Sequence, residues 1–394
     1  MKKLFFFLFT LITLNVCAQE IVIGKKHQIE SKVLNENREY WVSLPSSYRK
    51  NGYKKYPVLY FTDANLNSFF HAFSGITKQM SSDASPQIPE MIVVGIVSQN
   101  RVRDSAPTNS LVQWGGTATK ALETTGGADN FLKFLQTELV PHIEQNYHTA
   151  DYRILAGYSF TGLTVIHSLY QTPEFFNAYM AIDPSLWWDN QIMLKRFREF
   201  SKKELSKRQL FVSTSERVPS LYPKENYVIE FIQKLEASPV KGLNVHAKVF
   251  GTDQNHHTMQ IMSFYLGLKN IFSGYMIDDA IRFRPATELK AHFENISDKL
   301  GVNLKPREGL VNFFGYNRLY DNQFPTNSAA AIEFFKLNAE YYPESYNAWD
   351  SLGEAYWHEK EYKLALDAYK KSTQLNPGNS NAKEKIKEIN TQLN

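Results

Sequence analysis

Residues 152–163 hold a serine in a setting that can make it a nucleophile. The β-type segment from Tyr152 to Ala156 leads into Gly157-Tyr158-Ser159-Phe160-Thr161-Gly162-Leu163, and apolar residues then recur at helical spacing. A strand, a tight turn carrying serine and a helix together form a nucleophile elbow. Such a turn exposes the hydroxyl, and N–H groups at the helix start favour negative charge that develops beside it. We therefore predict Ser159 as a nucleophile, although Thr161 replaces the last glycine of the G-x-S-x-G pattern.

Two adjacent histidines can supply the general base that a serine needs at neutral pH. Imidazole suits this role because its ordinary pKa is about 6.5. Of the 10 histidines, His256 and His257 follow a β-type segment and precede the last helical pattern of this half of the chain. That is where the base stands when a triad runs in the order serine, acid, histidine. His167, two turns into the helix after the serine, is typical of a core or surface residue. No third ligand has metal-binding spacing near the pair, so we predict no metal site.

The carboxylate of a triad is expected at the end of a strand between the serine and the histidines. The β-type segment at 210–215 ends at Glu216, so we predict Glu216 as the acid. Asp253 and Asp183 are alternatives, as is a serine–histidine dyad without an acid.

The elements that must position these residues alternate between residues 20 and 275. Continuous apolar runs at 56–61 and 91–97 are typical of buried parallel strands, and residues 128–147 and 259–271 have helical periodicity. Segments 21–29 and 39–44 predict an antiparallel hairpin at the start. We therefore expect an α/β domain with a mostly parallel sheet flanked by helices.

Beyond about residue 285 the β-type segments stop and a 34-residue repeat begins. Ala331, Phe335 and Pro343 recur as Ala365, Tyr369 and Pro377. The segment with Trp349, Leu352-Gly353 and Tyr356 resembles the tetratricopeptide repeat, in which small residues let helices approach while aromatic residues fill the groove. Two repeats and a closing helix at 381–394 are fewer than the three needed for independent stability, so this module should pack on the first domain. A helical cap and a peptide-binding module are both compatible with the pattern.

Composition and the N-terminus limit the class of protein. The 394 residues are 43% hydrophobic and 21% charged, which is typical of globular domains, and a net charge of +4 does not favour nucleic-acid binding. Lys2 and Lys3, a short apolar run and Ala18 predict a secretory signal peptide over 1–18, and hence an exported protein, periplasmic or secreted. Lipidation at Cys17, the single cysteine, is the alternative. No transmembrane segment is predicted, because the apolar run is too short to span a bilayer.

Several motifs, taken in order, resemble the esterase D-type esterases. These are α/β-hydrolases that include siderophore esterases acting on enterochelin-like trilactones, S-formylglutathione hydrolases and feruloyl esterases. The resemblance covers residues 21–275 and rests on Tyr56–Tyr60, Arg101–Pro107, Gly126–Asp129, the elbow, Pro184–Trp188 and His256–Leu268. It implies an α/β-hydrolase fold with Ser159 as nucleophile and His256 as base. The family usually has histidine at the position of Tyr158 and glycine at that of Thr161.

The resemblance also places the groups around the substrate. It implies an oxyanion hole formed by the backbone N–H of Phe160 with that of Ala64 or Asn65. Trp187 and Trp188 are expected near the pocket mouth as an aromatic wall, with burial under a loop as the alternative. Tyr158 and Arg101 are expected as further substrate contacts. Arg101 could instead brace the long loop at 98–125.

The sequence thus predicts an exported serine esterase that needs no metal or organic cofactor. Siderophore lactones and acylated polysaccharides are both compatible substrates, and a protein partner could bind the repeats. The predicted division is a signal peptide (1–18), an esterase domain (19–277), a linker helix (278–305) and helical repeats (306–394). One alternative is a weak hydrolase scaffold, disabled by Thr161, whose repeats bind an envelope protein. Another is an acyltransferase that uses the same triad.

Overall fold

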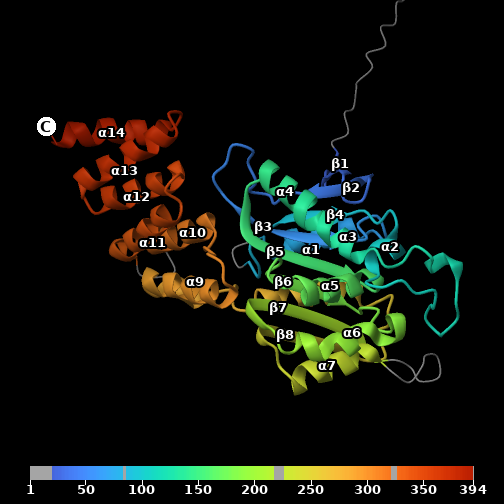
Figure 1. The fold of residues 1–394 in the computed structure, drawn as a ribbon. Helices are drawn as coiled ribbons and strands as arrows, with labels where there is room; N and C mark the ends of the chain where they lie inside the picture. The colour runs from blue at the N-terminus through green and yellow to red at the C-terminus, as the bar shows by residue number, and fades with distance from the viewer. Residues whose placement is uncertain (1–19, 83–85, 217–225, 321–325, 394) are drawn as a thin grey trace, which may run out of the picture.

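The structure, a computed structural model, describes residues 20–82, 86–216, 226–320 and 326–393 (Figure 1). The predicted signal peptide and Cys17 lie outside the described residues. In the part of the chain that is described, no helix is both long enough and apolar enough to span a bilayer.

An eight-stranded sheet forms the centre of the N-terminal part, which we call the sheet domain. Its order is β1-β2-β4-β3-β5-β6-β7-β8. The strands are β1 (Lys25–Ser31), β2 (Glu36–Ser43), β3 (Tyr56–Thr62), β4 (Ile92–Ile96), β5 (Thr149–Tyr158), β6 (Ala178–Ile182), β7 (Glu204–Ser215) and β8 (Lys241–Phe250). β2 pairs antiparallel with β1 and β4, and the remaining pairs are parallel. The predicted hairpin and mostly parallel sheet are confirmed.

The central strands are apolar throughout because both faces of the sheet are covered. Every residue of β3 is buried, and so is every residue of β4. Alternate side chains enter opposite cores: Val58 and Tyr60 pack in one cluster, Leu59 and Phe61 in the other. A continuous apolar run is therefore the pattern that such a strand requires.

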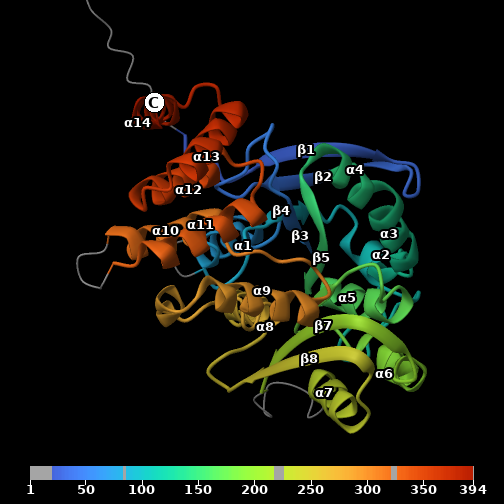
Figure 2. The same ribbon diagram turned by 90° about the vertical axis from the view of Figure 1, so that its left-hand side faces the viewer.

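Helices cover the two faces of the sheet in separate layers (Figure 1, Figure 2). One layer contains α2 (Arg101–Ser105), α3 (Ala128–Phe134), η2 (Leu135–Leu139), α4 (Val140–Asn146), α5 (Phe160–Gln171), α6 (Trp188–Phe200) and α7 (Tyr227–Ala237). The other contains α1 (Phe69–Met80), α8 (Gln260–Ile271) and α9 (Ala286–Leu300). A short turn, η1 (Lys120–Leu122), lies in the loop after α2. The helix predicted at 128–147 is confirmed as the continuous run of α3, η2 and α4.

The C-terminal part is all helical, as predicted. After η3 (Asp279–Phe283) and α9 come α10 (Glu308–Tyr320), α11 (Ser328–Tyr341), α12 (Tyr346–His358), α13 (Tyr362–Leu375) and α14 (Ser380–Leu393). Close approach explains two of its glycines: a Cβ on Gly353 would lie 2.9 Å from the Tyr369 ring, and one on Gly315 would lie 2.5 Å from the Phe335 ring. These aromatic residues occupy the repeated positions of the 34-residue pattern. The assignment to tetratricopeptide repeats stays a prediction.

The helices from α10 to α14, which we call the helical module, pack on the sheet domain through a shared core. Leu310, Val311 and Phe314 of α10 belong to the same buried cluster as Leu59 of β3 and Phe264 of α8. The module therefore packs on the sheet domain, as expected from its two repeats.

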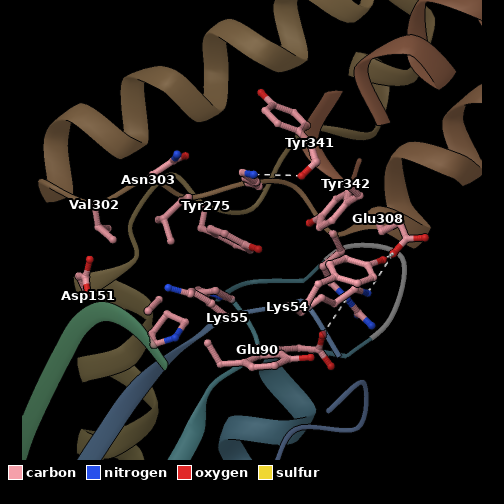
Figure 3. Close-up of a pocket in the computed structure, with 18 of the residues that line it drawn as sticks. Lys54, Lys55, Glu90, Asp151, Tyr275, Val302, Asn303, Glu308, Tyr341 and Tyr342 are labelled. Atoms are coloured by element: carbon pink, nitrogen blue, oxygen red, sulfur yellow. Dashed lines mark hydrogen bonds and ion pairs between the residues drawn. The ribbon is translucent and has the colours of Figure 1, made fainter. Parts of the chain in front are cut away.

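Polar contacts complete this junction around a cavity of about 510 Å³ (Figure 3). Glu308 of α10 accepts a 2.9 Å hydrogen bond from the Tyr53 hydroxyl and lies 3.2 Å from the Lys54 amine. Arg307 donates 2.9 Å to the Ser81 carbonyl and lies 3.8 Å from the Glu90 carboxylate. These pairs join the two parts of the chain and lie on different elements from the predicted nucleophile.

Candidate active site

Ser159 stands on a strained turn between β5 and α5. Its φ and ψ are 58° and −118°, a combination that residues other than glycine rarely adopt. Its N–H donates 2.8 Å to the Ile182 carbonyl of the neighbouring strand, which fixes the turn. A Cβ on Gly157 would lie 2.4 Å from the Thr161 carbonyl oxygen, and one on Gly162 would lie 3.1 Å from Pro184. Glycine at these two positions lets the strand and helix approach closely enough to form the elbow.

Thr161, the departure from the glycine pattern, is bonded into the elbow. Its side chain is 2% exposed. The hydroxyl oxygen accepts 3.1 Å from the Tyr158 N–H and lies 3.0 Å from both the Tyr158 carbonyl and Asp63 Oδ2. It thus replaces the close packing of a glycine with hydrogen bonds across the turn.

Asp63 and Arg101 support the elbow from the end of β3. Asp63 is fully buried with a φ of 64°, and it accepts hydrogen bonds from Ser98 Oγ (2.6 Å) and Arg101 Nε (3.0 Å). Arg101 Nη2 also donates 3.2 Å to the carbonyl of Tyr158. Arg101 was predicted to contact substrate or brace its loop. It does not line the pocket described below, and its contacts are those of a brace.

His256 forms a close pair with Asp183. His256 Nδ1 lies 2.6 Å from Asp183 Oδ2, and Thr214 Oγ1 donates 2.7 Å to the other carboxylate oxygen. Asp183 follows β6 with a φ of 40° and is 5% exposed, whereas His256 lies on the loop between β8 and α8. When Nδ1–H donates to the carboxylate, Nε2 keeps its lone pair and can accept a proton.

The structure replaces Glu216 with Asp183 as the acidic partner. The Glu216 N–H donates 2.8 Å to the Phe250 carbonyl, and the carboxylate is exposed without a hydrogen bond or ion pair to any described residue. β6 lies directly beside the nucleophile strand β5, and the loop after β8 reaches past β7 to it. Asp183 was one of the alternatives, and its signal is the short apolar segment at 178–182 that ends in Asp-Pro.

Ser159, Asp183 and His256 line one pocket of about 380 Å³. Trp187 lines it with Trp114, whose ring centroid lies 5.5 Å away in an edge-on arrangement. Trp114 was missed by the sequence analysis, because nothing in the loop pattern at 98–125 shows which side chain turns inward. Polar residues also line the pocket, among them Glu216, Gln254 and His257.

The chain is similar to known esterases and serine hydrolases in sequence and in fold. A family model described as "Putative esterase" matches residues 31–218. The match includes Ser159 and Asp183 and ends before His256. A solved IroE-like serine hydrolase from Shewanella oneidensis is 27% identical, with a TM-score of 0.72 over 81% of this chain and 99% of that one. The predicted α/β-hydrolase fold is confirmed.

Two curated relatives are siderophore esterases. The ferri-bacillibactin esterase BesA of Bacillus subtilis is 29% identical over 175 residues, which are 42% of this chain and 60% of that protein. The siderophore enterobactin esterase of Emericella nidulans is 28% identical over 173 residues, 40% of this chain and 57% of that protein. The chain thus spans about 60% of the length of these relatives. They support the predicted class, a carboxylic-ester hydrolase.

Besides Arg101, two further predicted substrate contacts lie outside the pocket. Trp188 is fully buried, its indole N–H donates 3.1 Å to Thr108 Oγ1, and its ring packs edge-on against Phe160 at 5.0 Å. Trp188 is therefore a core residue, and only Trp187 of the pair reaches the pocket. Tyr158 is 7% exposed and its hydroxyl donates 2.7 Å to the His256 carbonyl, so it contacts the base loop and not the cavity.

The predicted oxyanion donors fall into two groups. The Ala64 N–H donates 3.1 Å to the Ile96 carbonyl, so it is not available to an oxyanion. Ala64 is therefore no longer a candidate donor. The N–H groups of Asn65 and Phe160 make no hydrogen bond to any described residue. Phe160 is the first residue of α5, where the helix leaves its N–H groups unsatisfied.

Other titratable groups lie away from this chemistry. His167 is 1% exposed, Nε2 lies 2.7 Å from Asp129 Oδ1, and burial lowers its pKa. It is a core residue, one of the two settings, core or surface, that its helical position indicated. Among the described residues, no three or more His, Cys, Asp or Glu side chains are grouped to hold a metal ion.

Proposed function

We propose that this protein is an exported serine esterase that hydrolyses a carboxylic ester through an acyl-enzyme on Ser159. One observation carries the proposal: the strained elbow that presents Ser159 and the hydrogen-bonded pair of His256 and Asp183 open on the same pocket. Family similarity to esterases supports it.

In the first half-reaction, Ser159 Oγ attacks the ester carbonyl carbon and its proton passes to His256 Nε2. Asp183 keeps the imidazole oriented and stabilises the imidazolium that forms. The carbonyl oxygen becomes an oxyanion, for which the Phe160 and Asn65 N–H groups are the proposed donors. The tetrahedral intermediate collapses, and the leaving alcohol takes the proton from His256.

In the second half-reaction, water replaces the alcohol. His256 Nε2 accepts a proton from the water as its oxygen attacks the acyl carbon. Collapse releases the carboxylic acid and returns the proton to Ser159 Oγ. Both half-reactions use the same serine and the same imidazole, which accepts a proton and then returns it in each. They are compatible with the geometry described above.

The relatives suggest a substrate class. Both curated relatives are named for siderophores, so we propose a siderophore ester, such as a trilactone, as the first substrate to test. The aromatic wall of Trp114 and Trp187 suits an aryl acyl group. The N-terminal pattern supports export, and the helical module is the proposed site for any protein partner.

Turnover that depends on Ser159 tests the proposal. Residues 19–394, a Ser159→Ala variant and a Ser168→Ala control would each be incubated with short-chain nitrophenyl esters and with a catecholate trilactone. Ser168 lies on the same helix α5 and is fully buried away from the pocket. We expect turnover by the native chain and the control, and loss of at least about 10³-fold in Ser159→Ala. Equal rates in all three proteins would refute the esterase.

A further inference from the structure

Tyr158 joins the nucleophile strand to the loop that carries the base. We propose that Tyr158 is a positioning residue for His256: it holds the base loop against the elbow and keeps the imidazole at the pocket that it shares with Ser159. This inference rests on the proposed function. It replaces the expectation that Tyr158 contacts substrate.

Two contacts connect Tyr158 to His256. The phenol O–H donates 2.7 Å to the His256 backbone carbonyl. The two rings lie with their centroids 4.7 Å apart at an interplanar angle of 32°. One contact holds the backbone of the base and the other holds its side chain, so together they limit both the position and the tilt of the imidazole.

Tyr158 is itself firmly held. Its N–H donates 3.1 Å to Thr161 Oγ1 and its carbonyl accepts 3.2 Å from Arg101 Nη2. Its ring packs edge-on against Phe69 with centroids 5.8 Å apart. As the last residue of β5, it also pairs with Ile182 of β6, the residue before Asp183. A rigid residue next to the nucleophile therefore sets the position of the base.

The loop that bears the base has few other anchors to the sheet domain. Its backbone bonds are local turns: Gln254 to Gly251, Thr258 to Asn255 and Met259 to Asn255. Besides Tyr158, the contacts of His256 are the Asp183 pair, an edge-on ring contact with the adjacent His257 at 5.0 Å, and a longer hydrogen bond of 3.4 Å from Gln260 Nε2 to the same carbonyl. Loss of the Tyr158 hydroxyl would leave that carbonyl with the longer bond alone.

The Tyr158 hydroxyl can donate a hydrogen bond at neutral and mildly alkaline pH. Burial raises the pKa of Tyr158 to about 12. The phenol therefore stays protonated at neutral and mildly alkaline pH. Small displacements of a base cost rate much more than they cost stability, because proton transfer requires a narrow geometry.

A matched pair of tyrosine variants tests the inference. Tyr158→Phe removes the hydroxyl and keeps the ring. Tyr152→Phe is the control, because Tyr152 lies on the same strand, is fully buried and has a hydroxyl without a hydrogen-bond partner among the described residues. We expect kcat per active site to fall about tenfold in Tyr158→Phe with KM unchanged, and to be unchanged in Tyr152→Phe.

Active-site titration separates positioning from folding. The burst amplitude with a nitrophenyl ester should stay stoichiometric in Tyr158→Phe, since a merely structural role would lower the number of titratable sites and leave the rate per site unchanged. The low-field proton NMR resonance of His256 Nδ1–H gives a second readout. It should broaden in Tyr158→Phe and not in Tyr152→Phe.

A double-mutant cycle with Gln260→Leu completes the test. Tyr158 and Gln260 donate to the same carbonyl, so the double variant should lose more than the two single losses combined. A rate per site in Tyr158→Phe equal to that of the native chain would overturn the inference. It would not affect the proposed esterase activity. Absence of Ser159-dependent turnover in the native chain would instead refute the esterase itself.

Discussion

Asp183 Oδ2 lies 2.6 Å from His256 Nδ1, and this contact joins the end of β6 to the loop after β8. The other carboxylate oxygen is held by Thr214 of β7, the strand between them. The carboxylate thus has a fixed orientation before substrate arrives. It selects the tautomer in which Nε2 is free to serve as the base.

Exchange of the two candidate acids distinguishes their roles. We expect Asp183→Asn to lower kcat by about 10³- to 10⁴-fold, because the amide can stabilise the wrong tautomer and cannot stabilise an imidazolium. Glu216→Gln, at the exposed rim of the same pocket, should keep kcat within a few-fold. Steady-state kinetics on a nitrophenyl ester measure both. The reverse ranking would restore Glu216 as the acid.

Substitutions at Thr161 test whether its hydroxyl supports the elbow. Thr161→Ser keeps the hydroxyl and should retain most activity. Thr161→Val has the same shape without the hydroxyl, leaves one donor fewer at the buried Asp63 carboxylate, and should lose about 1–3 kcal/mol of unfolding free energy together with activity. Urea unfolding and kcat give the two numbers.

Thr161→Gly introduces the glycine that the esterase D-type esterases usually have at this position, and it is the decisive variant. Thr161→Gly should also lower kcat, because this elbow relies on the hydroxyl. A rise in kcat above that of the native chain would show that threonine disables the elbow and would favour the weak-scaffold alternative.

The sequence predicted the nucleophile and base more easily than their surroundings. Ser159 follows a distinct strand pattern, so local spacing was enough to single it out. Spacing left His256 and His257 open as the base, and the family resemblance favoured His256. The acid was harder, because Asp183, Glu216 and Asp253 all follow β-type segments, and the choice depends on which strand end the base loop reaches. The partners of Tyr158 and Thr161 lie 98 residues away in the chain, so no local pattern encodes them.

Two adjacent tryptophans are a second case in which the sequence does not show where a side chain lies. Trp187 and Trp188 have the same side chain, and only the turn before α6 decides that one lines the pocket and the other enters the core. The fold was predictable because buried parallel strands appear as continuous apolar runs and helices have helical periodicity. Both patterns can be recognised without knowledge of any contact. The helical repeat was likewise visible as a period of 34 residues.

Glycine substitutions test the packing of the helical module. Gly353→Ala would place a methyl group 2.9 Å from the Tyr369 ring, so we expect a loss of about 1–3 kcal/mol of unfolding free energy. Gly309→Ala, in α10, meets no atom within 4 Å and should stabilise by up to about 1 kcal/mol, because alanine favours helix. Urea unfolding measures both. Equal stability of the two variants would contradict the close helix approach described at Gly353.

Glu36 should make stability depend on acid pH. Hydrogen bonds from Arg103, with Arg38 as a second donor, lower the pKa of Glu36 from 4.5 to about 2. An acid whose pKa is lowered in the folded state stabilises it above the unfolded pKa and loses that contribution as pH falls. We therefore expect Glu36→Gln to cost about 1 kcal/mol at pH 7, with the gap to the native chain narrowing between about pH 4.5 and pH 2.

Thermal unfolding over that pH range checks the prediction. Glu199→Gln is the control, since Glu199 pairs with Lys202 on the exposed surface. A gap for Glu36→Gln that stays constant from pH 7 to pH 2 would show that the carboxylate is not held by the arginines.

Covalent trapping of the nucleophile tests the central claim most directly. A fluorophosphonate reacts with a serine only when a base activates it, so intact-mass and peptide mass spectrometry of residues 19–394 would locate the adduct. We predict one adduct per chain, on Ser159, with labelling abolished in Ser159→Ala and slowed at least about 10²-fold in His256→Ala. An unlabelled chain, or an adduct on another serine, would contradict the account.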